Sequence, residues 1–117
     1  MEKRNEILEL SFEFSIAIIE FCELLEDNRK YVIARQLLKS GTSIGANVRE
    51  AQNPHSRADF ISKLIIAAKE ADETEYWLLL CEKSNRYPNP GKLFDSITSI
   101  KKLLNKIIGS SKKNQSR

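Results

Sequence analysis

Metal-binding and nucleophilic chemistry both depend on side chains that are scarce in this sequence. The chain has one histidine, His55, which follows Pro54 in a stretch that we expect to be a loop. A di-metal carboxylate centre in a helical protein needs Glu-x-x-His pairs on two helices and single glutamates on two others. Glu50, Glu70 and Glu73 could supply carboxylates, but no imidazole can join them. We therefore expect no metal, no cofactor, no catalytic residue and no enzymatic activity.

One enzymatic alternative stays open. Arg49 and His55 form an Arg-x5-His spacing, which is similar to the catalytic motif of HEPN-type ribonucleases, a group of dimeric helical bundles. Glu50 stands where that motif usually has Asn, Asp or His, and Pro54 places His55 outside a helix. An HEPN-like ribonuclease that uses Arg49 and His55 is kept as the alternative.

Small polar residues form a second group that could carry a function. They recur every three or four positions between residues 36 and 50, so they share one helix face. A solvated face is one explanation, but Ser, Thr and Asn favour helix formation less than long charged residues do. We predict a hydrogen-bonded network with the next helix, inside the fold or at a subunit contact. Its members are Gln36, Ser40, Ser43, Asn47, Glu50, Glu70, Glu73, Thr74 and Trp77.

Basic side chains are the candidate nucleic-acid contacts, because lysine and arginine neutralise phosphates. The net charge is only +3, yet the first 27 residues hold eight acidic side chains and the last 17 hold six basic ones and no acid. Such a division could pair the two ends, give an assembly one acidic and one basic surface, or only keep the chain solvated. The candidates are Arg35, Lys39, Arg49, Lys101, Lys102, Lys106, Lys112 and Lys113.

Four helical segments must position these residues. Apolar side chains recur at spacings of three and four in each of them, which is one face of an α-helix. Short polar joints favour antiparallel neighbours, so the sequence predicts an all-α protein, an antiparallel up-down-up-down four-helix bundle over residues 1–109. The helices are expected at about 5–26, 30–52, 56–84 and 90–108.

Capping signals refine these boundaries. Ser56 and Asp59 resemble a capping box at the start of the third helix. Asn89 followed by Pro90 predicts the N-cap and the first residue of the fourth helix. Residues 110–117 have lost the apolar pattern, and we expect them to form a basic flexible tail.

The second helix contains Gly41 and Gly45 in its middle. With Thr42 and Ile44 between them, these glycines cost about 3 kcal/mol of helix propensity relative to good helix formers. Small residues four apart let another backbone approach closely, which would compensate. A break into two short helices is the alternative, but the apolar period continues through both glycines, and we therefore predict close packing.

The first helix carries an apolar face and an acidic row. Its apolar residues at core spacing run from Ile7 to Leu25, and Phe12 and Ile19 are expected to widen the buried stripe. Ile16 fills a gap in the acidic row. The row is expected to face water or a basic partner, because like charges repel along a helix.

The composition limits the classes of protein to which the chain can belong. The chain has 117 residues, of which 41% are hydrophobic and 30% charged, as in one folded soluble domain. It has no uncharged apolar run of signal-peptide type and no window of about 18 apolar residues, so we expect neither secretion nor a membrane span. Cys22 and Cys81 are expected to be reduced, buried thiols. We predict a cytoplasmic protein.

Three blocks of the sequence resemble a known family. They are residues 36–51, which include the string Ser-Ile-x-x-Asn-x-x-Glu, residues 59–64, and residues 69–78, which include Glu-Thr-x-Tyr-Trp. In this order they are similar to the "four helix bundle protein" family, which is also called the 23S rRNA intervening-sequence protein or S23 family. The resemblance covers most of the chain.

The resemblance implies a ring-like homopentamer of antiparallel four-helix bundles with no accepted catalytic activity. Many relatives are encoded within insertions in bacterial 23S ribosomal RNA genes. A related branch contains the accessory protein of diversity-generating retroelements, which binds nucleic acid and a reverse transcriptase. The chain differs from that branch in being only mildly basic.

Two functions outside catalysis follow from these observations. The first is a non-enzymatic homo-oligomeric bundle that binds RNA, a ribonucleoprotein or a reverse transcriptase through its basic residues. The second is a protein–protein scaffold that binds no nucleic acid.

Overall fold

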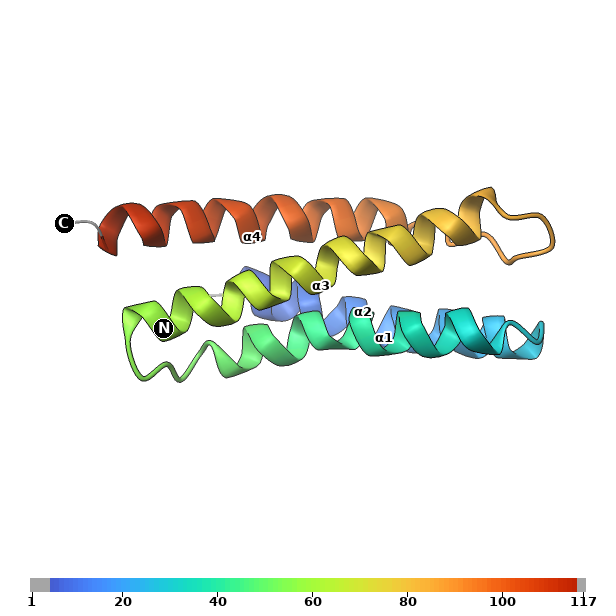
Figure 1. Cartoon of the computed structure of the whole chain (residues 1–117), viewed down its shortest axis with the longest axis horizontal. Helices are drawn as coiled ribbons and strands as arrows, with labels where there is room; N and C mark the ends of the chain where they lie inside the picture. The colour runs from blue at the N-terminus through green and yellow to red at the C-terminus, as the bar shows by residue number, and fades with distance from the viewer. Residues whose placement is uncertain (1–4, 116–117) are drawn as a thin grey trace.

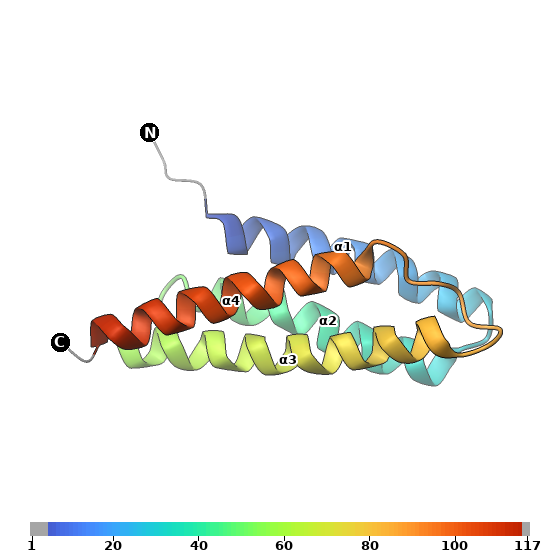
Figure 2. The ribbon, with the colours of Figure 1, turned by 90° about the horizontal axis from the view of Figure 1, so that it is seen from above.

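The computed structural model describes residues 5–115 and contains four α-helices and no strand in that range (Figure 1). Each helix contacts its neighbours in chain order, and the contact between the first and the last helix is the least extensive. The first helix begins and the last helix ends at the same end of the molecule (Figure 2). This arrangement confirms the predicted all-α, up-down-up-down bundle. The helices are α1 (Glu6–Asp27), α2 (Tyr31–Glu50), α3 (Arg57–Lys83) and α4 (Leu93–Gln115).

Side-chain caps fix the start of two helices. The side chain of Asn5 accepts a hydrogen bond from the Leu8 backbone N–H at the start of α1, at 3.2 Å. At the start of α3, Ser56 Oγ accepts from the Asp59 N–H at 3.0 Å, and Asp59 Oδ2 accepts from the His55 N–H at 3.1 Å. These bonds satisfy backbone donors that have no partner within the helix. The predicted capping box at Ser56 is confirmed, with the carboxylate bound one residue earlier than in the usual motif.

The start of α4 differs from the prediction. Asn89 Oδ1 accepts a hydrogen bond from the Gly91 N–H at 2.7 Å, and Gly91 has a φ of 56°. The asparagine side chain therefore closes a turn two residues on, in a backbone conformation that suits glycine. Helix begins only at Leu93. The prediction of Asn89 as N-cap and Pro90 as first helical residue is wrong.

The end of α4 also differs, because the helix continues through Gln115. Ile108 and Ser111 are buried, so the inward-facing positions extend past Gly109 into the segment expected to be a flexible tail. Packing of these inward-facing side chains stabilises the helix even though most other residues of the segment are polar. The expected boundary at residue 109 is therefore corrected for residues 110–115. Residues 116–117 lie outside the described range.

The core lies along the bundle axis, where all four helices contribute fully buried aliphatic side chains. Each such side chain contributes roughly 1.5–3 kcal/mol by leaving water. No helix among the described residues combines the length and the apolar character that spanning a bilayer requires. The largest fully buried aliphatic residues are Ile18, Leu25, Leu37, Ile44, Leu64, Leu78, Ile97, Ile100 and Leu104.

Helix α2 runs unbroken through both of its internal glycines, and both face α1. A methyl group on Gly41 would lie 2.9 Å from two carbons of the buried Ile18 side chain. A methyl group on Gly45 would lie 3.1 Å from Ser15 Oγ and 3.2 Å from the Ser11 carbonyl oxygen. The predicted close packing is seen at both glycines: the Ile18 side chain fills the space at Gly41, and the backbone of α1 approaches at Gly45.

Alanine substitutions at two helical glycines should have opposite effects on stability. Gly109→Ala, where nothing lies within 4 Å, gains helix propensity and should raise the free energy of unfolding by about 0.5–1 kcal/mol. Gly41→Ala gains the same propensity, but overpacking Ile18 costs roughly 1–3 kcal/mol, so it should be destabilising by about 1 kcal/mol. Urea denaturation followed by circular dichroism measures both. Equal stabilisation would show that α1 and α2 are not in close contact at Gly41.

Candidate functional site

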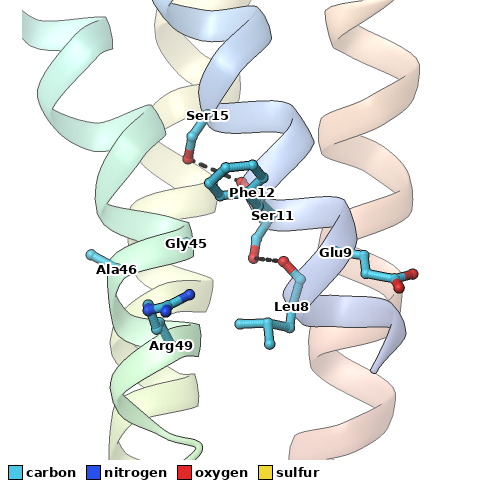
Figure 3. Close-up of a pocket in the computed structure, with 8 residues that line it drawn as sticks. All are labelled: Leu8, Glu9, Ser11, Phe12, Ser15, Gly45, Ala46 and Arg49. Atoms are coloured by element: carbon cyan, nitrogen blue, oxygen red, sulfur yellow. Dashed lines mark hydrogen bonds between the residues drawn. The ribbon is translucent and has the colours of Figure 1, made fainter. Parts of the chain in front are cut away.

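A groove between α1 and α2 is the largest hollow described on the protein. It has a volume of about 570 Å³. Its floor is made of small residues, among them Ser11, Ser15 and Gly45. Figure 3 shows the Phe12 ring and the Arg49 side chain on either side of this floor, with the guanidinium group reaching between the two helices.

The polar groups on the groove floor have partners within α1. Ser11 Oγ donates to the Leu8 carbonyl at 3.3 Å, and Ser15 Oγ donates to the Ser11 carbonyl at 3.0 Å (Figure 3). Hydroxyls that are satisfied in this way present little unmet polarity to an occupant. The polarity of the groove therefore lies at its charged lining residues, Glu9 and Arg49, rather than on its floor.

One part of the predicted polar network lies in the core. The hydroxyl groups of Ser40 on α2 and Thr74 on α3 share a hydrogen bond of 2.9 Å, and both residues are fully buried. The Ser40 hydroxyl also lies 3.5 Å from the Leu37 carbonyl oxygen, and the Thr74 hydroxyl lies 2.7 Å from the Glu70 carbonyl oxygen. This pair fixes α2 against α3 at a single register, because a buried hydroxyl that lost its partner would cost free energy.

The other predicted members do not form a continuous network. Ser43 Oγ donates to the Lys39 carbonyl at 2.6 Å, and Asn47 Nδ2 donates to the Ser43 carbonyl at 2.9 Å, so both bonds stay within α2. Gln36 is exposed. Outside the Ser40–Thr74 pair, no continuous network joins these side chains within one copy, because they satisfy their hydrogen bonds on their own helix. A network at a subunit contact stays a prediction.

Three further members form pairs near the surface. Lys63 on α3 donates to Glu50 on α2 at 3.2 Å, and this is an ion pair between helices. The indole N–H of Trp77 donates to Glu73 Oε2 at 3.0 Å, within α3. The Trp77 ring also contacts the ring of Tyr76 edge to face, with centroids 5.3 Å apart.

Glu70 lies where its charge is less favourable than usual. Partial burial, followed by the neighbouring carboxylate of Glu73, raises the pKa of Glu70 above its ordinary value, and the ammonium group of Lys39 opposes this effect. Lys39, a predicted nucleic-acid contact, therefore lies close to carboxylates. Their negative charge would weaken its attraction for phosphate.

Lys101 has a structural role. Its ammonium group lies 2.9 Å from Asp72 Oδ1 and 2.9 Å from Glu75 Oε1, both on α3. The hydrogen bonds to Glu75 and Asp72 raise the pKa of Lys101. Lys101 was predicted as a nucleic-acid contact, and the structure instead places it in a clamp between α3 and α4.

The remaining basic candidates fall into two groups. Arg35 and Arg49 are exposed on α2 and line hollows that face α1. The others are exposed on α4, where a spacing of four and seven places three of them on one outward row. We call this the α4 lysine row, which consists of Lys102, Lys106 and Lys113. Lys112 is also exposed on α4, outside the row.

The structure does not bring Arg49 and His55 together in one hollow. Arg49 lines the groove toward α1, whereas His55 lines a separate hollow with Asp59 and Lys63 from α3. No group of three or more His, Cys, Asp or Glu residues that could hold a metal ion occurs within residues 5–115.

Both cysteines are buried and free, as the sequence predicts. Burial raises the pKa of the Cys22 thiol to about 12, with smaller contributions from Glu26 and Cys81, and raises the pKa of the Cys81 thiol to about 11. The thiolate, which is the nucleophile, is accordingly disfavoured at both positions. Cys22 Sγ instead donates to the Ala34 carbonyl at 3.4 Å.

The outer side of α1 contains a feature that the sequence did not reveal. Phe12 and Ile19 were expected to widen the buried stripe, but they are 61% and 44% exposed, and Ile16 is 45% exposed. The spacing of these residues was visible in the sequence, but it could not tell a wider core face from an exposed apolar strip. The structure decides the matter, because it leaves Phe12, Ile16 and Ile19 exposed while Ile18 of the same helix is fully buried.

Comparisons with known proteins show what this chain is similar to. Residues 3–106 match a family described as "23S rRNA-intervening sequence protein". A crystal structure of a protein of unknown function from the S23 ribosomal protein family of Bacteroides thetaiotaomicron VPI-5482 is 45% identical in sequence. The match covers 87% of this chain and 97% of that one, with a TM-score of 0.82. No curated protein matches the chain.

The buried hydroxyl pair predicts a specific coupling between Ser40 and Thr74. Ser40→Ala or Thr74→Val alone leaves a buried hydroxyl with a poorer partner and should cost about 1–2 kcal/mol. The double variant should cost clearly less than the sum of the two, by about 1 kcal/mol, because it removes both hydroxyls. Thermal or urea denaturation of the four proteins gives the coupling. Strict additivity would mean that the two hydroxyls do not interact.

The Lys101 clamp predicts a pH-dependent contribution to stability. Lys101→Met should lower the free energy of unfolding by about 0.5–1 kcal/mol near neutral pH. Because the pKa of Lys101 is raised in the folded state, the contribution is complete below the ordinary lysine pKa of about 10.4. It is lost as the pH rises through the folded-state value. Denaturation curves of the two proteins should therefore converge at strongly alkaline pH, and a constant difference would contradict the clamp.

Proposed function

Because this chain belongs to the 23S rRNA-intervening sequence protein family, we propose that it is a non-enzymatic, self-associating bundle that binds structured RNA or a ribonucleoprotein. The observation that carries the RNA-binding part is the α4 lysine row. The family description names a 23S rRNA intervening sequence, and the row is a surface with the charge that phosphates need.

The α4 lysine row is favourable for phosphate because of its surroundings on the same helix. No acidic residue occurs from Ser96 to the end of the described helix. Lys102, Lys106 and Lys113 are all exposed, so their ammonium groups are accessible to a ligand. Three exposed cations on one side of a helix without acidic neighbours on that helix attract phosphates together.

Self-association is the second part of the proposal. Exposed aromatic and aliphatic side chains on α1 and α2 support it, because monomeric soluble proteins rarely leave such residues grouped at their surface. A closed ring of five copies in the bacterial cytoplasm is the form that the family resemblance suggests. A reverse transcriptase or another ribonucleoprotein component is the corresponding protein partner.

Two other functions have less support. A protein scaffold without nucleic acid would explain the exposed apolar residues but not the α4 lysine row. A ribonuclease would need Arg49 and His55 in one site, and they line different hollows. RNA binding by the assembled protein is therefore the function that we put forward.

The α4 lysine row should determine RNA affinity. The triple variant Lys102→Gln, Lys106→Gln, Lys113→Gln should weaken binding to a structured RNA and reduce the slope of log affinity against log salt by roughly 2–3. Glu6→Gln should strengthen binding modestly, because Glu6 lines a shallow hollow together with Lys102 and Lys106. Fluorescence anisotropy over a range of salt concentrations measures both effects.

A matched control removes the same number of charges elsewhere. The variant Lys69→Gln, Lys83→Gln, Lys92→Gln also replaces three exposed lysines but lies outside the row. It should keep most of the affinity and the salt slope. Equal losses in the two triple variants would point to net charge alone, and negligible binding of the unmodified protein at low salt would refute RNA binding.

A further inference from the structure

One side of α3 carries acidic and aromatic side chains that neither the core nor the α4 lysine row uses. They recur at spacings of four and three, so they share one side of the helix. Apolar residues stand at both ends of this series, and two glutamates stand in its middle. We call it the α3 stripe, which consists of Ile66, Glu70, Glu73, Trp77 and Leu80, with Tyr76 beside it. Ile66 is 40% exposed and Tyr76 is 54% exposed, so another molecule can reach the stripe.

Contacts within α3 hold the aromatic rings and one carboxylate of the stripe in place. The indole N–H of Trp77 donates to Glu73 Oε2 at 3.0 Å. The rings of Tyr76 and Trp77 meet edge to face, with 5.3 Å between their centroids. Side chains that are already fixed in this way lose less conformational entropy when they bind another molecule. The stripe is therefore organised for binding before a ligand arrives.

The negative charge of the stripe is only partly balanced within the chain. Neither Glu70 nor Glu73 forms an ion pair with another residue of the range 5–115, although Lys69 stands one turn before Glu73. Partial burial and the neighbouring Glu73 raise the pKa of Glu70, and the ammonium group of Lys39 opposes this shift without cancelling it. A further cation close to both carboxylates would stabilise their charged forms.

We propose that the α3 stripe binds a basic segment of a partner protein, with an arginine of that segment against Glu73 and the exposed ring of Tyr76. A guanidinium group pairs with carboxylates and stacks on aromatic faces, so this combination of side chains suits arginine. Ile66 and Leu80, at the ends of the stripe, would contact the apolar stems of the partner's side chains.

This assignment rests on the ribonucleoprotein-binding part of the proposed function and adds the surface and the chemistry of the protein partner. Proteins that contact RNA carry basic side chains, because these neutralise phosphates. RNA would bind at the α4 lysine row, and a basic protein component would bind at the α3 stripe. Two surfaces of opposite charge, on different helices, allow one copy to hold both components at once.

Other occupants fit the stripe less well. RNA bases could stack on Tyr76 and Trp77, but Glu70 and Glu73 would repel the phosphates that accompany them. The α4 lysine row of a second copy has the right charge but little apolar surface. The large hydrophobic residues that are exposed within the described range lie on α1, α2 and α3, so α4 offers none of them to Ile66.

Trp77 is the only tryptophan of the chain, so its fluorescence reports on the stripe alone. The probe is a short peptide of alternating arginine and alanine, added to the full-length protein at low salt. It should change the Trp77 emission in a saturable manner. The same peptide with citrulline in place of arginine has nearly the same shape without the charge, and it should cause no comparable change.

Three variants locate the binding on α3. Glu73→Gln removes the charge and keeps an oxygen that can accept from the Trp77 indole, and Tyr76→Leu removes the ring and keeps an apolar side chain. Each should weaken the arginine peptide by about two- to fivefold, measured by anisotropy of the labelled peptide. Glu82→Gln removes an exposed glutamate of α3 outside the stripe and should leave the affinity unchanged. Circular dichroism checks the fold of all three variants.

Four results would overturn the assignment of the stripe. They are no response to the arginine peptide, equal binding of the citrulline peptide, equal losses in Glu73→Gln and Glu82→Gln, and shielding of Trp77 from acrylamide by self-association, which would place a second copy on the stripe. Weaker RNA binding by Tyr76→Leu would assign the ring to RNA instead.

The RNA measurements separate this assignment from the proposal on which it rests. RNA affinity should be the same in Glu73→Gln, Tyr76→Leu and the unmodified protein, because the α4 lysine row lies on another helix. An intact arginine response without any RNA binding would refute the RNA part of the proposed function and support the stripe. RNA binding through the α4 lysine row without an arginine response would refute the stripe alone.

Discussion

The close approach of α1 and α2 at two glycines is the contact on which the remaining arrangement depends. A side chain at Gly41 would meet the buried Ile18, and one at Gly45 would meet the backbone of α1 at Ser11. Packing at this distance offsets the poor helix propensity of glycine, since the aliphatic side chains around it gain dispersion contacts in a dense core. Gly45 also lines the groove between α1 and α2, together with the exposed Phe12. The same contact thus belongs to both the core and the groove.

Polar side chains connect the helices at few positions. The buried Ser40–Thr74 pair joins α2 to α3, Lys63 and Glu50 join the same helices nearer the surface, and Lys101 joins α4 to α3. Most other hydroxyl and amide groups in these helices bond to carbonyls on their own helix. A hydrogen bond within one helix costs little free energy, because it needs no precisely placed partner on a neighbouring helix. The contact between α1 and α4 is the least extensive of the four helix–helix contacts.

Several features of the fold could be predicted because they depend on local pattern. The helix number, the antiparallel order, the cap at Ser56 and the need for close packing at Gly41 and Gly45 all follow from residue types at short spacings. Within one copy, the predicted polar network is limited to one buried pair for a related reason. Spacing shows that Ser43 and Asn47 share a face with Ser40, but it cannot show whether a side chain bonds across to α3 or back to its own helix. Similarly, charge counting placed Lys101 among the phosphate contacts, whereas Asp72 and Glu75 hold it in the fold.

The sequence by itself determined that this chain forms four amphipathic helices, because periodicity of apolar residues and capping are properties of neighbouring residues along the chain. It also determined that His55 has no second imidazole with which to build a metal site. Only the tertiary structure decided which apolar residues of α1 are buried and which of the lysines are available at the surface. Both depend on how closely another helix approaches and which charges it brings, and these are distances between residues far apart in the sequence.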